Sequence, residues 1–206
     1  MLHRRQVLTL AAAGLALTVL PGTRHSAWAQ SGSKATAFVK STGDKLVAVV
    51  NGPGTPQSKR QELTQIIDSA VDVDGVARFC LGRFWRTATP QQQKRYVALF
   101  HQVLVTNITG KLGEYQGVSF TVGRSRNQGD EEIVSTVVER PNNPPTNVDW
   151  VISDPSDNPK IIDVVAEGTS LRLTQRQDYA SFLAHNNGNV DALITAMERQ
   201  VSNMTG

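Results

Sequence analysis

Gly117-Val118-Ser119-Phe120-Thr121-Val122 is the stretch at which the hydrophobic period of this chain changes to two, the period of a half-buried β-strand. Three more stretches rich in alternating or β-branched apolar residues follow it, at 133–139, 148–153 and 161–167. Residues typical of turns separate them, at 124–130, 142–145 and 154–158. Four strands joined by short turns predict an antiparallel meander with one face covered by helices.

Helical periodicity precedes and follows these strands. A short helix is expected after Asp72 or Asp74, either of which can cap it, with Gly82 at its end. Thr89-Pro90-Gln91-Gln92 has the pattern of a capping box and predicts the start of the longest helix. Further helices are expected at 38–50, 59–71, 171–184 and 191–201. The order predicts an α+β domain: a four-stranded antiparallel curved sheet packed against a helical layer that encloses an apolar cavity.

Residues 1–29 have the pattern of an export signal. Arg4 and Arg5 are followed by an apolar run at 8–20, and Ala27-Trp28-Ala29 suits a signal peptidase. As a helix this run would be roughly 20 Å long, too short for a hydrocarbon core of ~30 Å. We therefore expect a cleaved signal peptide at 1–29, a single domain at 30–206 and a periplasmic location. Arg4-Arg5 suits both the general secretory and the twin-arginine route.

The basic charge of the chain comes from this predicted signal. The whole sequence has 21 Lys and Arg against 18 Asp and Glu, and residues 1–29 hold three arginines and no acid. Residues 30–206 therefore have 21 − 3 = 18 basic residues against 18 acidic ones. A neutral domain gives no electrostatic support for binding nucleic acid, and we expect none.

The residues of 30–206 form no recognisable catalytic or metal pattern, so we expect no enzyme, no metal and no cofactor. Cys80 is the only cysteine and stands between Phe79 and Leu81, which favours a buried thiol. His101 has no partner at ligand spacing and is expected on a helix, either at the surface or partly buried. Glu131-Glu132 and Asp163 are expected to be solvated. Arg78, Arg83 and Arg86 cluster around Phe84 and Trp85, either as surface arginines or as a site for an anionic headgroup.

Three segments resemble the MlaC family, also called the toluene-tolerance family. They are Val73–Pro90, then Val148-Asp149-Trp150 together with Lys160–Gly168, and finally Asn186–Leu193. The resemblance implies a monomeric periplasmic carrier that shuttles a phospholipid, or a related lipid such as a hopanoid, between an inner-membrane ABC transporter complex and an outer-membrane lipoprotein/porin complex. It also implies that the lipid tails lie in a cavity between sheet and helices, with the headgroup near solvent.

Apolar residues on both layers are the candidates for lining such a cavity, and each of them could equally fill an ordinary core. Arg83 and Arg86 are the candidates for the headgroup. The predicted lining residues are Val76, Phe79, Phe100, Leu104, Ile108, Phe120, Trp150, Ile152, Ile162 and Val164.

Two other functions remain open from the sequence. One is a small α+β enzyme, isomerase- or hydrolase-like, that uses Asp72, Asp74 or His101 as an acid–base pair facing the cavity. The other is an envelope adaptor that binds no lipid, which a cavity too small for an acyl chain would favour.

Overall fold

A computed structural model describes residues 26–205 of the chain. The predicted signal at 1–29 lies outside this range except for its last four residues, which are part of the first helix. The helices confirm the predicted α+β class and include two short 3-10 helices, η1 and η2. Their bounds are α1 Ser26–Asn51, α2 Pro56–Ala70, α3 Val73–Leu81, η1 Gly82–Arg86, α4 Pro90–Gly110, η2 Leu112–Tyr115, α5 Leu171–His185 and α6 Val190–Thr205.

The strands form one antiparallel sheet in which each strand pairs with the next along the chain. The sheet has five strands rather than the predicted four, because two residues after the last predicted strand pair back on it. So short a strand has no alternation of its own, and the sequence pattern therefore missed it. The strands are β1 Ser119–Gln128, β2 Glu131–Glu139, β3 Thr146–Ser153, β4 Lys160–Ala166 and β5 Thr169–Ser170.

The first hairpin corrects the prediction of a turn at 124–130. β1 continues through these residues to Gln128, and only Gly129 and Asp130 connect it to β2. The pairing register shifts between Val122 and Ser125, which is a β-bulge. All residues of β1 after the bulge are exposed, so this half of the strand buries no face and leaves no alternation in the sequence.

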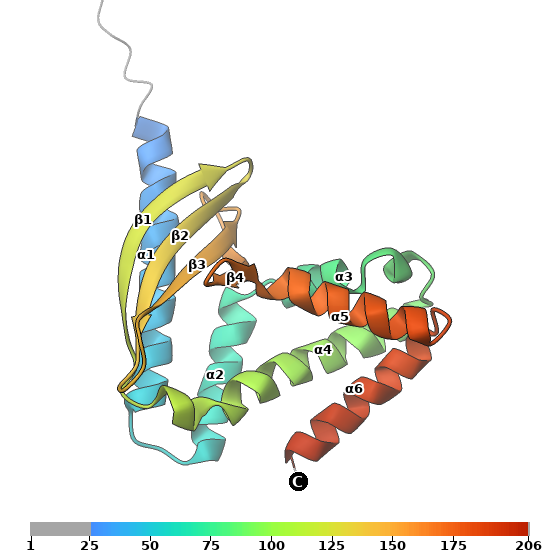
Figure 1. Cartoon of the computed structure of the whole chain (residues 1–206). Helices are drawn as coiled ribbons and strands as arrows, with labels where there is room; N and C mark the ends of the chain where they lie inside the picture. Colours follow the sequence, from blue (N-terminus) through green and yellow to red (C-terminus); the bar gives the residue numbers. More distant parts are fainter. Residues whose placement is uncertain (1–25, 206) are drawn as a thin grey trace, which may run out of the picture.

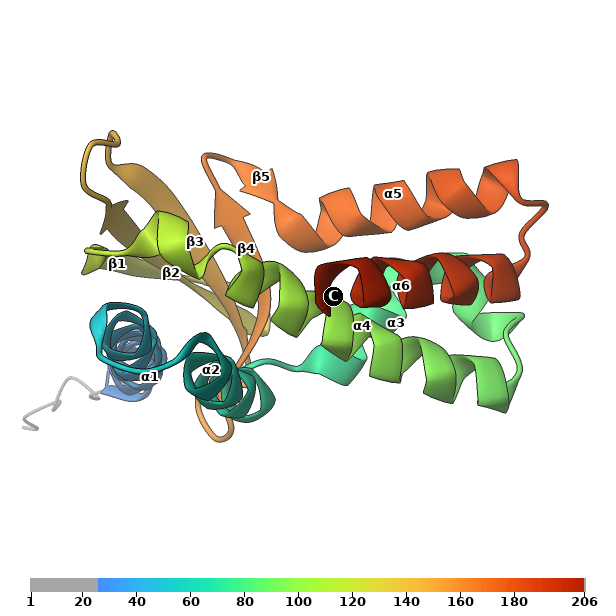
Figure 2. The ribbon, with the colours of Figure 1, turned by 90° about the horizontal axis from the view of Figure 1, so that it is seen from below.

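The helices fall into two groups around the sheet. In Figure 1, α1 runs along one face of the curved sheet, and α2 lies beside it. Figure 2, seen from below, shows both helices on the same side of the sheet, whereas α3, α4, α5 and α6 extend beyond the β4 side as a helical bundle. Within that bundle α3 packs against α5, and α4 packs against α6. The single predicted helical layer is therefore two helical groups that meet the sheet at different places.

The starts of α3 and α4 follow from the sequence as predicted, whereas α1 begins at Ser26 instead of at 38. With 26 residues α1 is also longer than α4, which has 21 and is the helix predicted to be the longest. The Thr89 side chain accepts a hydrogen bond from the amide of Gln92 at 3.2 Å, and Gln92 Oε1 accepts one from the amide of Thr89 at 2.8 Å. This reciprocal pair is the capping box at the start of α4. Asp72, rather than Asp74, caps α3, because its Oδ1 accepts from the amide of Gly75 at 3.0 Å.

Two carboxylates expected in solvent are buried. Glu132 is 1% exposed, because the register places it opposite Ile152, which packs in one hydrophobic cluster with Ala35 and Val39 of α1. Asp163 is 7% exposed, because its Oδ1 accepts from the amide of Arg172 at 3.0 Å, and Ser170 Oγ donates to its Oδ2 at 2.5 Å. Asp163 thus holds the start of α5 against β4, a role that residue type alone does not reveal.

Candidate functional site

The apolar interior is divided into two hydrophobic clusters. We call them the helical cluster and the sheet cluster, and partly buried apolar side chains surround each. The helical cluster is formed by Ala77, Cys80, Leu81, Ala88, Tyr96, Leu99, Phe100, Val103, Tyr179, Leu183, Val190, Leu193, Ile194 and Met197. The sheet cluster is formed by Ala35, Val39, Ala70, Val134, Ile152 and Ile161. A single domain usually has one contiguous core. Here the helical bundle and the sheet with α1 and α2 have separate apolar interiors, which meet without merging.

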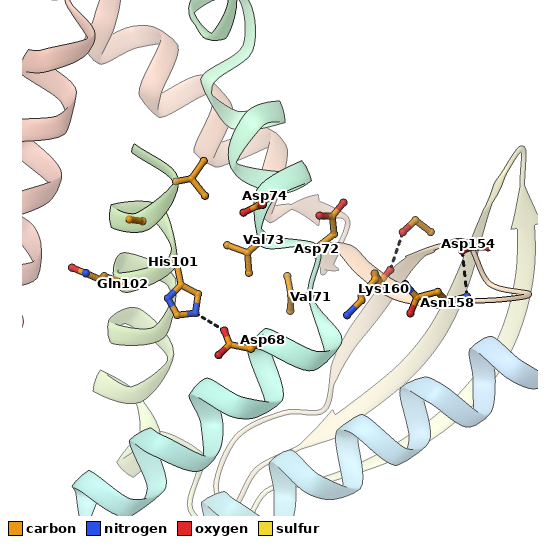
Figure 3. Close-up of a pocket in the computed structure, with 13 residues that line it drawn as sticks. Asp68, Val71, Asp72, Val73, Asp74, His101, Gln102, Asp154, Asn158 and Lys160 are labelled. Atoms are coloured by element: carbon orange, nitrogen blue, oxygen red, sulfur yellow. Dashed lines mark hydrogen bonds and ion pairs between the residues drawn. The ribbon is translucent and has the colours of Figure 1, made fainter. Parts of the chain in front are cut away.

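A pocket of about 730 Å³ lies where the two clusters approach each other. Val71 on its wall packs against the sheet cluster, whereas Val73 and Val97 pack against the helical cluster. Figure 3 shows the wall formed by the end of α2, the start of α3, the middle of α4 and the β3–β4 turn. Its volume is in the range of ligand-binding clefts.

Polar side chains line the same pocket and are tied to its walls. His101 Nε2 lies 2.6 Å from Oδ1 of Asp68, which joins α4 to α2 (Figure 3). Lys160 Nζ donates to the carbonyl oxygen of Ser69 at 2.6 Å and so joins β4 to α2. Together with the backbone bond from the amide of Asp72 to the carbonyl of Ile161, at 3.1 Å, these contacts hold the pocket walls together.

The pocket is rich in carboxylates. Four of them, on Asp68, Asp72, Asp74 and Asp154, line it together with the cation of Lys160. The alternative enzyme hypothesis named Asp72, Asp74 and His101, and the fold does bring these three side chains to one pocket (Figure 3). Asp72 accepts the hydrogen bond that caps α3, and His101 is held against Asp68, which links α4 to α2.

Six of the ten predicted lining residues belong to or border the two clusters, and none of the ten is among the residues that line the pocket. Phe100 is 7% exposed and Ile152 0%, so both are core residues in this structure. Phe100 packs with Tyr96 and Tyr179, at ring-centroid distances of 6.0 and 6.5 Å. Val76 and Phe79 border the helical cluster, and Trp150 and Val164 border the sheet cluster. Leu104, Phe120 and Ile162 are half-buried, and Ile108 is 39% exposed.

Trp150 illustrates how the sheet presents an apolar surface. The register sets it in one row with Val134 and Val164. Its indole Nε1 donates to Thr136 Oγ1 at 2.9 Å, and that hydroxyl donates to the carbonyl of Val148 at 3.0 Å. The polar end of the indole is therefore satisfied within the sheet, and the half-buried ring remains as apolar surface.

Sequence reasoning did not identify several residues of this region. Phe38, Val71 and Val122 border the sheet cluster and remain partly buried, and Asp68 and Lys160 line the pocket. The periodicity places Val71 and Val122 on apolar faces but gives no indication that these faces approach each other. Asp68 precedes Asp72 by four residues, and α2 ends between them. This spacing matches no known sequence motif, so the sequence does not mark Asp68 as a pocket residue.

Cys80 is buried, as predicted. Its side chain is 1% exposed, and its Sγ lies 3.5 Å from the carbonyl oxygen of Arg172. Burial raises the pKa of the thiol to about 12, with a smaller contribution in the same direction from the carboxylate of Asp163. A thiol with so high a pKa is inert at neutral pH.

Comparison with known proteins decides the family. The family model described as "MlaC protein" matches residues 40–199. The chain belongs to the MlaC family. Within the family, it is 23% identical to the toluene tolerance protein ttg2D of Pseudomonas putida over 201 residues, which cover 97% of this chain and 91% of that protein.

A solved structure shares the MlaC-like fold. It is the phospholipid-binding protein from Ralstonia solanacearum in complex with a phospholipid. It superposes with a TM-score of 0.74 at 23% sequence identity and covers 84% of this chain and 99% of its own. At this identity the likeness supports the fold, including the antiparallel sheet and its helices.

Residues 26–205 contain neither a membrane-spanning helix nor a metal-type cluster. Every helix in this range is too short or too polar to cross a bilayer. Within the same range, no three His, Cys, Asp or Glu side chains converge as ligands of a metal ion would.

Proposed function

We propose that this protein is a periplasmic carrier that binds a phospholipid, or a related lipid such as a hopanoid, and passes it between an inner-membrane ABC transporter complex and an outer-membrane complex. The observation that carries the proposal is the division of the interior into two clusters with partly buried apolar side chains and a pocket between them. Membership of the MlaC family and the phospholipid in the Ralstonia solanacearum structure support the same chemistry.

The energetics suit a carrier that acts without a covalent step. Two acyl chains expose several hundred Å² of apolar surface, whose burial contributes on the order of 10 kcal/mol at ~25 cal/mol per Å². Trp150, Phe38 and Val122, which pack against the sheet cluster and are only partly buried, offer apolar surface that a tail can cover. Release then requires only a partner that offers the tails another apolar site. A reaction on the lipid is not part of the proposal.

Tryptophan quenching by lipids brominated on their acyl chains tests this function. Trp85 and Trp150 are the tryptophans of the described residues other than Trp28, which falls in the predicted signal. In Trp85→Phe, the emission of Trp150 reports on the sheet cluster. In Trp150→Phe, the emission of Trp85 reports on η1, where the guanidinium of Arg78 lies 5.7 Å from its ring centroid. We expect strong quenching of Trp150 and weak quenching of Trp85.

Native mass spectrometry of the purified protein provides the complementary measurement. A carrier is expected to retain a stoichiometric lipid, which extraction and mass spectrometry then identify as a phospholipid or a hopanoid-like lipid. If the protein carries no lipid under gentle conditions and brominated lipids leave Trp150 unquenched, the carrier proposal is wrong, and the adaptor hypothesis gains support.

A further inference from the structure

Arginine side chains of η1 and α5 lie close to aromatic rings of α3 and η1. The guanidinium carbons of Arg172 and Arg176 lie 4.8 and 4.7 Å from the centroid of the Phe79 ring. That of Arg83 lies 4.8 Å from the centroid of Phe84. These distances are within the range of cation–π contacts, so each ring fixes the position of a guanidinium that would otherwise move freely.

These contacts form a continuous strip. A Cβ built on Gly82 would lie 3.4 Å from the Arg176 guanidinium, and one built on Gly188 would lie 3.2 Å from Phe84. Gly82 directly precedes Arg83, so the arginines of α5 and η1 are neighbours on this side of the protein. We call Arg83 and Arg176, with the rings of Phe79 and Phe84, the arginine strip.

Apart from these ring contacts, the cations of the strip are paired with no carboxylate among residues 26–205. In the part of the chain that the structure describes, neither Arg83 nor Arg176 forms an ion pair, and the same holds for the exposed Arg78 and Arg86 beside them. Arg172 differs, because it lies 3.4 Å from Asp163 and 3.6 Å from Glu131. The positive charge is therefore concentrated locally, although residues 30–206 are neutral as a whole.

Stacking on a ring leaves a guanidinium able to bind an anion. A cation–π contact uses no oxygen acceptor, so the N–H donors of the exposed Arg83 and Arg176 remain available for paired hydrogen bonds to a phosphate. Beside the strip, Leu171 and Leu173 on the first turn of α5 are 53% and 48% exposed. Arginine, aromatic rings and exposed leucines are the composition of surfaces that rest in the headgroup layer of a bilayer.

We propose that the arginine strip docks this protein on an anionic phospholipid membrane, with Arg83 and Arg176 binding headgroup phosphates and Leu171 and Leu173 entering the interface. This inference goes beyond lipid carriage, because it concerns the membrane surface rather than the lipid held inside. It places the α3–α5 side of the protein against the bilayer.

Co-sedimentation with vesicles tests the proposal directly. The full protein is mixed with vesicles of phosphatidylglycerol and phosphatidylcholine, or of phosphatidylcholine alone, at low salt. We expect binding only to the anionic vesicles, and binding that weakens as salt screens the charges. Each arginine near an anionic surface contributes about a fivefold change in partitioning, so R83Q/R176Q is expected to bind roughly 25-fold more weakly.

A matched control removes the same charge elsewhere. R124Q/R199Q takes one exposed arginine from β1 and one from α6, and it is expected to retain most of the binding. In Trp150→Phe, the emission of Trp85 beside the strip is expected to shift to the blue on anionic vesicles. Circular dichroism confirms that each variant is folded.

Three outcomes would overturn the proposal. One is that the wild-type protein ignores anionic vesicles or binds neutral ones equally well. Another is that R124Q/R199Q weakens binding as much as R83Q/R176Q, since the effect would then be one of net charge alone. The last is that R83Q/R176Q purifies without the lipid that the wild-type protein holds, which would assign the strip to the carried lipid's headgroup. The quenching of Trp150 by brominated lipids tests lipid carriage independently of membrane docking, so the two proposals can fail separately.

Discussion

Gly43 lies within α1 at the point where the helix crosses the sheet, and the tip of the Phe120 ring fills the space a side chain would need. A Cβ built on Gly43 would meet Cζ of Phe120 and lie 2.7 Å from both Cε atoms. Ordinary carbon contacts are about 3.5–4.0 Å. Substitution of Gly43 by Ala therefore tests whether α1 rests on β1 as the structure shows.

Two opposing effects determine how much Gly43→Ala changes the stability of the protein. Replacing a glycine inside a helix by alanine stabilises by about 0.5–1 kcal/mol, because the unfolded chain loses freedom. Forcing a methyl group into a filled contact costs about 1–3 kcal/mol. Gly43→Ala is thus expected to destabilise the protein by about 1–2 kcal/mol. In Phe120→Ala, where the ring is gone, the same change is expected to stabilise by up to about 1 kcal/mol.

Urea denaturation followed by circular dichroism measures all four proteins of this double-mutant cycle. The expected coupling between Gly43 and Phe120 is about 2 kcal/mol. Gly110→Ala is the matched control, since no atom lies within 4 Å of a Cβ built at this position at the end of α4, and it is expected to cause little change or a small gain. Equal stabilisation by Gly43→Ala with and without the Phe120 ring would show that α1 does not pack on this strand.

Two further predictions concern the helical cluster. The hydroxyl of Tyr96 donates to the carbonyl of Ala77 at 2.9 Å, and the residue is fully buried. Tyr96→Phe should therefore lower the free energy of unfolding, measured in urea, by about 1–2 kcal/mol, whereas Tyr179→Phe, for which no such bond is described, should lower it clearly less. Equal losses of stability in the two variants would refute this role of the Tyr96 hydroxyl. Because the folded pKa of Cys80, about 12, lies above its ordinary value of 9.0, its contribution to stability is complete below pH 9 and decreases by about 1.4 kcal/mol per pH unit between these values. Cys80→Ala should therefore flatten the loss of stability above pH 9, and an unchanged slope would contradict the burial of this thiol.

The sequence by itself determined the local structure of this protein and its family. The change of period at Gly117, the capping box at Thr89 and the turn at 154–158 depend on contacts between residues close in the chain, which their residue types specify. The same holds for the burial of Cys80, since its immediate neighbours are apolar. The pattern does not reveal the far half of β1, which buries neither face, or β5, which is too short to alternate.

The tertiary structure alone decided how these elements share the interior. Sequence periodicity identifies an apolar face but not the face that it meets. It therefore predicts Phe100 and Trp150 as lining residues of one cavity, whereas Phe100 belongs to the helical cluster and Trp150 borders the sheet cluster. The contact between Asp68 and His101 joins two helices across 33 residues of chain, and the burial of Asp163 depends on how the start of α5 folds back against β4. Such contacts arise from packing directions in space, which no single segment encodes.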